Sequence, residues 1–133
     1  MAQLIDIERN YRKLSQSIKY AWRGIIYTTR KEMHMRFHLS ASILSLLLGY
    51  TLKISLIEYL ILLVSIFLVL ISEMVNTSLE ISVDLVTREK KPRAMLAKDV
   101  GAGAVLLASI NAIIIGYFIF YDRVVIFFNT LFH

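Results

Sequence analysis

The residues best suited to chemistry lie between positions 73 and 84, where a long apolar run ends. On a helix that turns about 100° per residue, Glu73, Glu80 and Asp84 differ by only about 20–40°, and Asn76 and Thr77 lie within about 60° of Glu73. Three carboxylates and an amide therefore share one stripe. Carboxylates near hydrocarbon normally face protein, water or a bound cation, and clustered like charges repel unless a metal or protons separate them. Oxygen ligands of this kind favour Mg²⁺, which takes one or two carboxylates together with substrate phosphates.

A solvated helix end beyond a bilayer is the alternative interpretation of this stripe. It suits Asp84 better than Glu73, which directly follows the apolar run 54–72. Glu32, within the basic run 30–36, is expected at the same interface as Glu80, although a carboxylate among bases is usually a weak surface ion pair. His34 and His38 have a spacing found in zinc sites, but no HExxH pattern accompanies them and we predict no zinc site.

A second polar region, residues 88–99, contains five Lys and Arg residues. These charges fit either membrane topology or the binding of a polyphosphate. No GxxxxGK[ST] loop is present, and Gly101 and Gly103 fit close helix packing better than a phosphate cradle. Any nucleotide site is therefore expected to be built from side chains.

The composition indicates what kind of molecule must position these residues. The chain has 133 residues, of which 57% are hydrophobic, and it contains no cysteine; its mean hydropathy is +0.64. Disordered chains are poor in apolar residues, and without cysteine neither a disulfide scaffold nor a cysteine-bearing zinc site can form. So small a soluble domain could not bury such long apolar runs, so we predict an integral membrane protein.

We predict an all-α fold in a single domain, 1–133. An amphipathic helix with Trp and Tyr on its apolar side lies on the membrane surface within residues 1–36. Transmembrane spans follow at 37–53, 54–76 and 102–121, and a loop covers 84–101. Three thin helices leave little interior, so a homo-oligomer is expected.

The distribution of basic residues sets the expected orientation. Residues 1–36 carry eight of the fifteen Lys and Arg, residues 88–98 carry five, and only Lys53 and Arg123 lie elsewhere. The positive-inside rule then places the N-terminus and the 84–101 loop in the cytoplasm. Because the basic residues flank apolar runs, the net charge of +5 indicates membrane topology and not nucleic-acid binding.

The polar stripe also carries a resemblance. The run 73–80 (EMVNTSLE), with Asp84 and the later run 97–99 (AKD), resembles the small prokaryotic diacylglycerol kinase family, which includes undecaprenol kinases. Further matches are the run 20–24 (YAWRG) and Glu32 with Arg36, so the resemblance covers roughly residues 12–121. It implies a homotrimer in the bacterial inner membrane, with a surface helix and three transmembrane helices per subunit. Such a protein phosphorylates a lipid alcohol with MgATP at the cytoplasmic interface.

The resemblance also implies a role for each matching residue. Glu73 is expected to be the general base, Glu80 and Glu32 to hold Mg²⁺, and Asn76 to orient the carboxylates or the lipid hydroxyl. Lys98 is expected to bind phosphate. The residues expected to contact ATP are Lys13, Tyr20, Glu32, Asn76, Glu80, Asp84, Glu89, Lys91, Lys98 and Asp99, and those expected to contact the lipid are Glu73, Trp22 and Arg36.

Two departures from the family pattern concern the nucleotide and not the chemistry. Lys90 and Lys91 stand where family members often have an aromatic residue or histidine. Lys13 stands where an arginine can occur, and a lysine binds phosphate there with poorer bidentate geometry.

The run 32–38 (EMHMRFH) bears on the choice of lipid. It is closer to the E-x-N-x-R-[IF]-H of the undecaprenol kinase branch than to the diacylglycerol kinase branch, so we favour undecaprenol, with diacylglycerol as the alternative. Two alternatives belong to other classes. In a small oligomeric transporter Glu73 would carry protons or cations, and neither Glu32 nor the Lys98-Asp99 pair would be needed. In a scaffold or regulatory subunit the whole stripe would be expendable.

Overall fold

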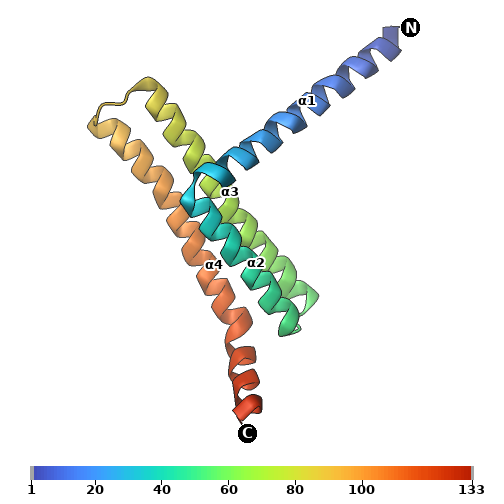
Figure 1. Ribbon diagram of the computed structural model, residues 1–133, viewed down its shortest axis with the longest axis vertical. Coiled ribbons are helices and arrows are strands. Elements are labelled where there is room, and N and C mark those ends of the chain that lie inside the picture. Colours follow the sequence, from blue (N-terminus) through green and yellow to red (C-terminus); the bar gives the residue numbers. More distant parts are fainter. Residues whose placement is uncertain (1, 133) are drawn as a thin grey trace.

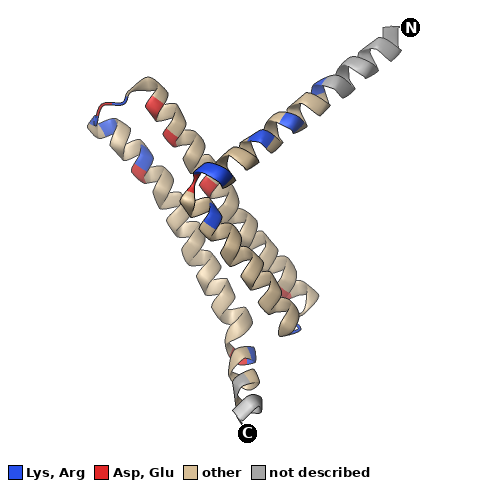
Figure 2. Cartoon of the chain, in the orientation of Figure 1, with Lys and Arg blue, Asp and Glu red and all other residues tan. Residues whose placement is uncertain are grey.

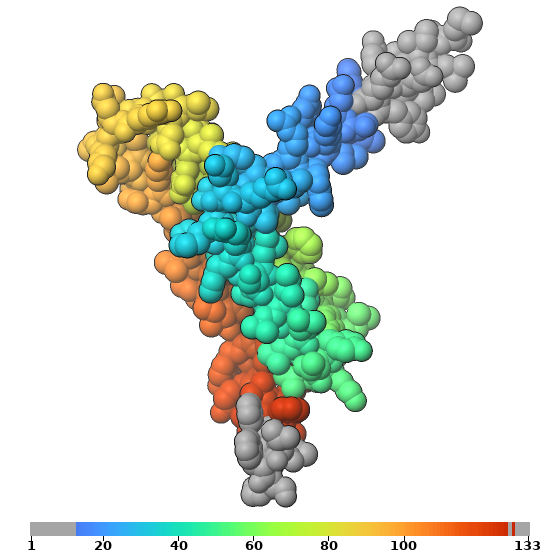
Figure 3. Space-filling model, in the orientation of Figure 1, coloured from blue at the N-terminus to red at the C-terminus, as the bar shows by residue number. Residues whose placement is uncertain are grey.

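The fold consists of four α-helices joined by short connections. A computed structural model describes the backbone of residues 2–132 and the side chains of residues 13–127 and 129. The helices in chain order are α1 (Ala2–Lys31), α2 (Met33–Thr51), α3 (Leu56–Val86) and α4 (Pro92–Phe132) (Figure 1). Helices α2, α3 and α4 form an elongated bundle, and α1 runs away from it at an angle (Figures 1 and 3). All elements in residues 2–132 are helical, which confirms the predicted all-α class.

The helix boundaries differ from the predicted segments in three regions, one of which is the end of α4, which continues past 121 to Phe132. Glu32 has an extended backbone (φ −91°, ψ 123°), so the chain breaks there and not after position 36. Helix α3 continues past the predicted end at 76, and of the expected 84–101 loop only residues 87–91 lie outside helices. Pro92 favours the early start of α4, because it is the first residue of that helix, a position where the missing N–H group costs nothing.

A tight turn joins α2 to α3 and lies against the main hydrophobic core. Ser55 caps α3: its hydroxyl accepts a hydrogen bond from the Glu58 backbone N–H, and the Glu58 carboxylate accepts one from the Ser55 N–H. This reciprocal capping box satisfies two backbone donors that a helix start leaves unpaired. The adjacent core contains Ile54, Leu62 and Ile119, which come from the turn, α3 and α4.

Helices α3 and α4 pack as an antiparallel pair that is tied near both ends. At one end Arg123 of α4 donates two hydrogen bonds to Glu58 of α3, at 2.8 Å and 2.9 Å. At the other end Lys98 of α4 pairs with Asp84 of α3. This bidentate ion pair gives Glu58 a structural role, and its partnership with Arg123 was not predicted from the sequence.

The outer faces of the bundle are apolar. Large hydrophobic side chains such as Leu47, Phe67 and Ile113 are exposed on α2, α3 and α4. Two helices in the described part of the chain, α3 and residues 92–127 of α4, are long and apolar enough to cross a membrane. Helix α2, on which the predicted span 37–53 falls, is not one of them. Charged residues gather on α1 and around the connection from α3 to α4, with few at the opposite end of the bundle (Figure 2). This distribution agrees with a helical membrane protein.

Candidate active site

Glu73 lies inside the bundle. It is 4% exposed and shares the buried face of α3 with Ser65, Val69 and Thr77. The Thr77 hydroxyl donates to the Glu73 backbone carbonyl at 3.0 Å. Where the structure describes side chains, the ion pairs join Lys91 to Glu89, Lys98 to Asp84 and Arg123 to Glu58, so none neutralises Glu73. A buried carboxylate without a cationic partner does not serve stability, which favours a role in chemistry.

One turn further along α3, an amide and a carboxylate lie together. The Asn76 Nδ2 atom donates to Glu80 Oε1 at 3.0 Å, and both residues are half-buried. The i, i+4 spacing on one helix face brings the two side chains within reach. The bond engages one carboxylate oxygen of Glu80, so the other is available to a ligand.

Near the end of α3, two pairs of residues from the expected ATP-binding set are joined. Lys98 on α4 and Asp84 on α3 form an ion pair, with 35% and 53% of their side chains exposed. Lys91 and Glu89, in the connection, pair at 3.3 Å and are more exposed. Both lysines are partly solvent-exposed, so an anionic ligand arriving from water can reach them. Asp99, the remaining member of this region, is exposed on α4.

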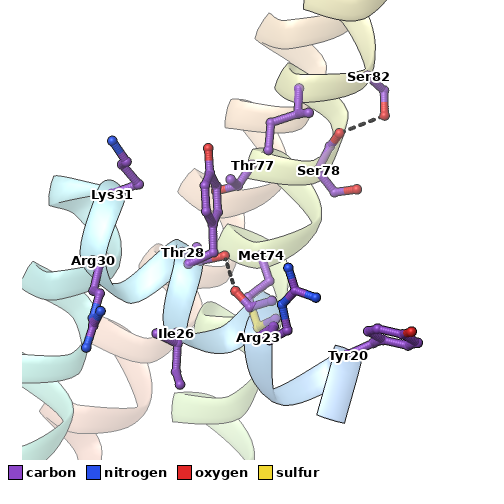
Figure 4. A pocket seen from close by; sticks show the side chains of 13 residues that line it. Tyr20, Arg23, Ile26, Thr28, Arg30, Lys31, Met74, Thr77, Ser78 and Ser82 are labelled. Atoms are coloured by element: carbon purple, nitrogen blue, oxygen red, sulfur yellow. Dashed lines mark hydrogen bonds between the residues drawn. The ribbon is translucent and has the colours of Figure 1, made fainter. Parts of the chain in front are cut away.

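A groove of about 750 Å³ separates the last turns of α1 from α3 (Figure 4). From α3 its lining includes Met74, one residue after Glu73, and Thr77, one turn further on. In Figure 4, Arg23 of α1 lies beside Met74. The full lining is Tyr20, Arg23, Gly24, Ile26, Tyr27, Thr28, Arg30, Lys31, Met74, Thr77, Ser78, Ile81 and Ser82. The groove thus combines an apolar wall with cationic and hydroxyl groups, and Glu73 adjoins its lining in the chain, next to Met74, without being part of it.

The predicted contacts of α1 are only partly gathered at this groove. Tyr20 lines it, whereas Trp22 is 62% exposed and is not part of the lining. Lys13 of α1 and Arg36 of α2 are also exposed and are not part of the lining. Arg23 was not predicted to be a site residue. Its position in the YAWRG run, one residue after Trp22, could have indicated that it belongs to the site.

Glu32 lies at the break between α1 and α2 and is half-buried. Within the described side chains, no three His, Asp or Glu residues gather closely enough to hold a metal ion. The donor chemistry nevertheless fits Mg²⁺, because Glu80 has an oxygen free of the Asn76 bond and this ion typically uses one or two carboxylates plus phosphate oxygens and water.

Comparison with known proteins identifies the family. Residues 19–120 match the family model of prokaryotic diacylglycerol kinase. The chain is 35% identical over 118 residues to the undecaprenol kinase of Bacillus subtilis (strain 168). The aligned residues cover 89% of this chain and 96% of that protein. It is 38% identical over 101 residues to a diacylglycerol kinase of Synechocystis sp. (75% of this chain, 58% of that protein) and 30% identical over 104 residues to that of Escherichia coli K12 (78% and 85%). The chain therefore belongs to the prokaryotic diacylglycerol kinase family and is a lipid kinase.

Proposed function

We propose that this protein transfers the γ-phosphate of ATP to the hydroxyl group of undecaprenol at the cytoplasmic face of a bacterial inner membrane. It acts as a homotrimer, in which each subunit has the surface helix α1 and three transmembrane helices, α2 to α4. The observation that carries the proposal is the buried, unpaired Glu73 carboxylate beside the groove between α1 and α3. The exposed apolar faces of the bundle support both membrane insertion and packing between subunits.

The length of α3 supports an active site at the membrane boundary. Helix α3 begins at Leu56 and Glu73 lies 17 positions later, which at 1.5 Å per residue is about 26 Å along the axis. A hydrocarbon core is about 30 Å thick. With the start of α3 at the outer boundary, Glu73 lies just inside the inner boundary, and Glu80, about 10 Å further along, lies in the headgroup region. A lipid hydroxyl and a water-borne nucleotide meet at this depth.

In this mechanism Glu73 removes the proton from the lipid hydroxyl as the oxygen attacks the γ-phosphorus. The bond from the γ-phosphorus to the oxygen bridging the β- and γ-phosphates breaks, and ADP leaves with that oxygen. The lipid alcohol reaches the base from the bilayer, with its hydroxyl at the Met74 end of the groove and its chain in the hydrocarbon core. Phosphoryl transfer depends mainly on positioning and on neutralising charge, so no covalent intermediate with the protein is required. Arg23 places a cation in the same groove, where it attracts the phosphate of the product.

The nucleotide side of the site is formed by residues from α3, α4 and their connection. Glu80 and Glu32 would hold Mg²⁺, which when bound neutralises charge on the ATP phosphates. Lys98 exchanges Asp84 for a phosphate oxygen, and Asp84 and Asp99 form the polar wall. Lys13, Tyr20, Asn76, Glu89 and Lys91 complete the proposed ATP contacts, and Trp22 and Arg36 the proposed lipid contacts.

Undecaprenol is preferred to diacylglycerol for two reasons. The run 32–38 is closer to the undecaprenol kinase pattern. The similarity to the Bacillus subtilis undecaprenol kinase also extends over nearly the full length of both chains. Diacylglycerol stays the second candidate, since relatives with that name are 30–38% identical to this chain.

The test is phosphate transfer by the purified protein. The protein in detergent micelles receives γ-labelled ATP, Mg²⁺ and either undecaprenol or diacylglycerol, and kcat/KM is measured for each lipid. We expect the higher value for undecaprenol. A higher value for diacylglycerol would overturn the substrate assignment while leaving the reaction class, and transfer to neither lipid would overturn the proposed function.

A further inference from the structure

Helix α4 makes an unusually close approach to α3 at Gly101. A Cβ atom added to Gly101 would lie 2.5 Å from the Asn76 Oδ1 atom. Carbon and oxygen atoms in non-bonded contact lie well over 3 Å apart, so any larger residue at 101 must displace the amide. The space of the missing side chain is occupied by the Asn76 carboxamide.

The two ends of that carboxamide have different surroundings. Its Nδ2 atom donates to Glu80 Oε1 at 3.0 Å. Its Oδ1 atom is buried and has no hydrogen-bond partner. The bond to Glu80 fixes which end of the amide faces Gly101, and the space left by the glycine is what allows the unpaired oxygen to lie there.

We propose that Gly101 is a positioning residue for the phosphoryl transfer, because its bare backbone is what allows the Asn76 amide to point its N–H group at the Glu80 carboxylate. This inference rests on the proposed role of Glu80 as a ligand of the metal ion. Gly101 contacts neither substrate nor metal and acts only through Asn76. Its role is therefore distinct from that of the carboxylates.

The amide, and not the helices, is expected to move when a side chain is added. Helices α3 and α4 are tied on both sides of this contact by the Asp84–Lys98 and Glu58–Arg123 ion pairs. The Asn76 side chain is short and held at Oδ1 by no hydrogen bond. Turning it away costs little folding energy but breaks its bond to Glu80.

Gly103 provides a matched control. It lies two positions further along α4, and a Cβ atom added there would meet nothing within 4 Å. Gly101→Ala and Gly103→Ala therefore make the same chemical change in the same helix, and the two differ in the contact with Asn76. A general effect of alanine on α4 would appear in both variants.

The experiment measures kcat, the Mg²⁺ concentration for half-maximal activity, and binding of Mn²⁺ with a non-hydrolysable ATP analogue by electron paramagnetic resonance. We expect Gly101→Ala to weaken divalent-ion affinity by about 10- to 100-fold and to lower activity with it, as is typical when a residue that orients a metal ligand is changed. Gly103→Ala should stay within about twofold of the parent protein. In an Asn76→Ala background, Gly101→Ala should add less than about twofold, since the displaced amide is already gone.

Three results would overturn the proposal. One is an equal loss of activity from Gly101→Ala in the parent protein and in the Asn76→Ala background. The others are wild-type activity in Gly101→Ala and a loss of activity with unchanged Mn²⁺ binding. If Gly101→Ala does not assemble, the Asn76→Ala/Gly101→Ala variant decides. Assembly with the activity of Asn76→Ala supports the proposal, and failure to assemble overturns it. An unmodified protein that transfers no phosphate would instead refute the proposed function, and the Mn²⁺ measurement would still test Gly101.

Discussion

Replacing Glu73 with glutamine should have opposite effects on activity and stability. Glutamine keeps the shape of the side chain but cannot accept the proton of the lipid hydroxyl. Loss of a general base typically costs about 10²- to 10⁴-fold in rate. We therefore expect Glu73→Gln to lower kcat by that range with little change in KM for ATP, because Glu73 is not among the nucleotide contacts.

The expected gain in stability follows from the burial of this carboxylate. Glu73 is 4% exposed, and the described ion pairs do not include it. A charged side chain at the centre of a transmembrane helix costs about 2.5–3.5 kcal/mol by insertion scales. Glu73 lies near the boundary, so a smaller gain of about 1–2 kcal/mol is expected for the neutral amide.

Two measurements are made: label transfer to the lipid, and thermal unfolding in detergent, which is monitored by circular dichroism. Asp122→Asn is the matched control, since it makes the same carboxylate-to-amide change at an exposed position near the far end of α4. Glu73→Gln should be inactive and melt at a higher temperature, and Asp122→Asn should resemble the parent protein. Retained activity would refute the general-base assignment, and a lower melting temperature would show that the carboxylate stabilises the fold.

Three further predictions concern the metal, the ion pair and the turn. Glu80→Gln should raise the Mg²⁺ concentration for half-maximal activity by about 10- to 100-fold, and an unchanged Mg²⁺ dependence would contradict its role. Arg123→Ala should lower the midpoint of a denaturant titration, and the Glu58→Gln/Arg123→Ala variant should be no worse, because it no longer leaves the partly buried Glu58 carboxylate without its cation. Gly49→Ala places a Cβ atom 2.8 Å from Ile54 Cδ1 and should cost about 1–3 kcal/mol on thermal unfolding; equal stability would show that the turn adapts freely.

The polar stripe of α3 could be predicted from helical periodicity alone. Asn76 and Glu80 were expected on one face, and they form a hydrogen bond there. Burial of Glu73 agrees with the expectation that a carboxylate at the end of an apolar run faces protein or a ligand. These features depend on local geometry, which a sequence specifies directly.

Features set by contacts between helices could not be predicted in the same way. Gly101 and Gly103 both look suited to close packing, but only the neighbour across the α3–α4 interface makes Gly101 tight and leaves Gly103 open. The basic run before Pro92 resembles a long loop, yet the proline begins α4 and most of that region is helical. Likewise, no sequence pattern shows that Arg123 reaches Glu58 across the bundle.

The register between α3 and α4 connects these features. The ion pairs at Glu58–Arg123 and Asp84–Lys98 lie on either side of the Asn76–Gly101 contact along the same antiparallel pair. A slip of α4 by one residue would rotate its side chains by about 100° and move Gly101 away from the amide. Val100 or Ala102 would then face the Asn76 amide, and the Cβ atom of either residue would clash with it. The distant Glu58–Arg123 pair therefore helps to preserve the carboxylate geometry of the active site, although neither residue takes part in the chemistry.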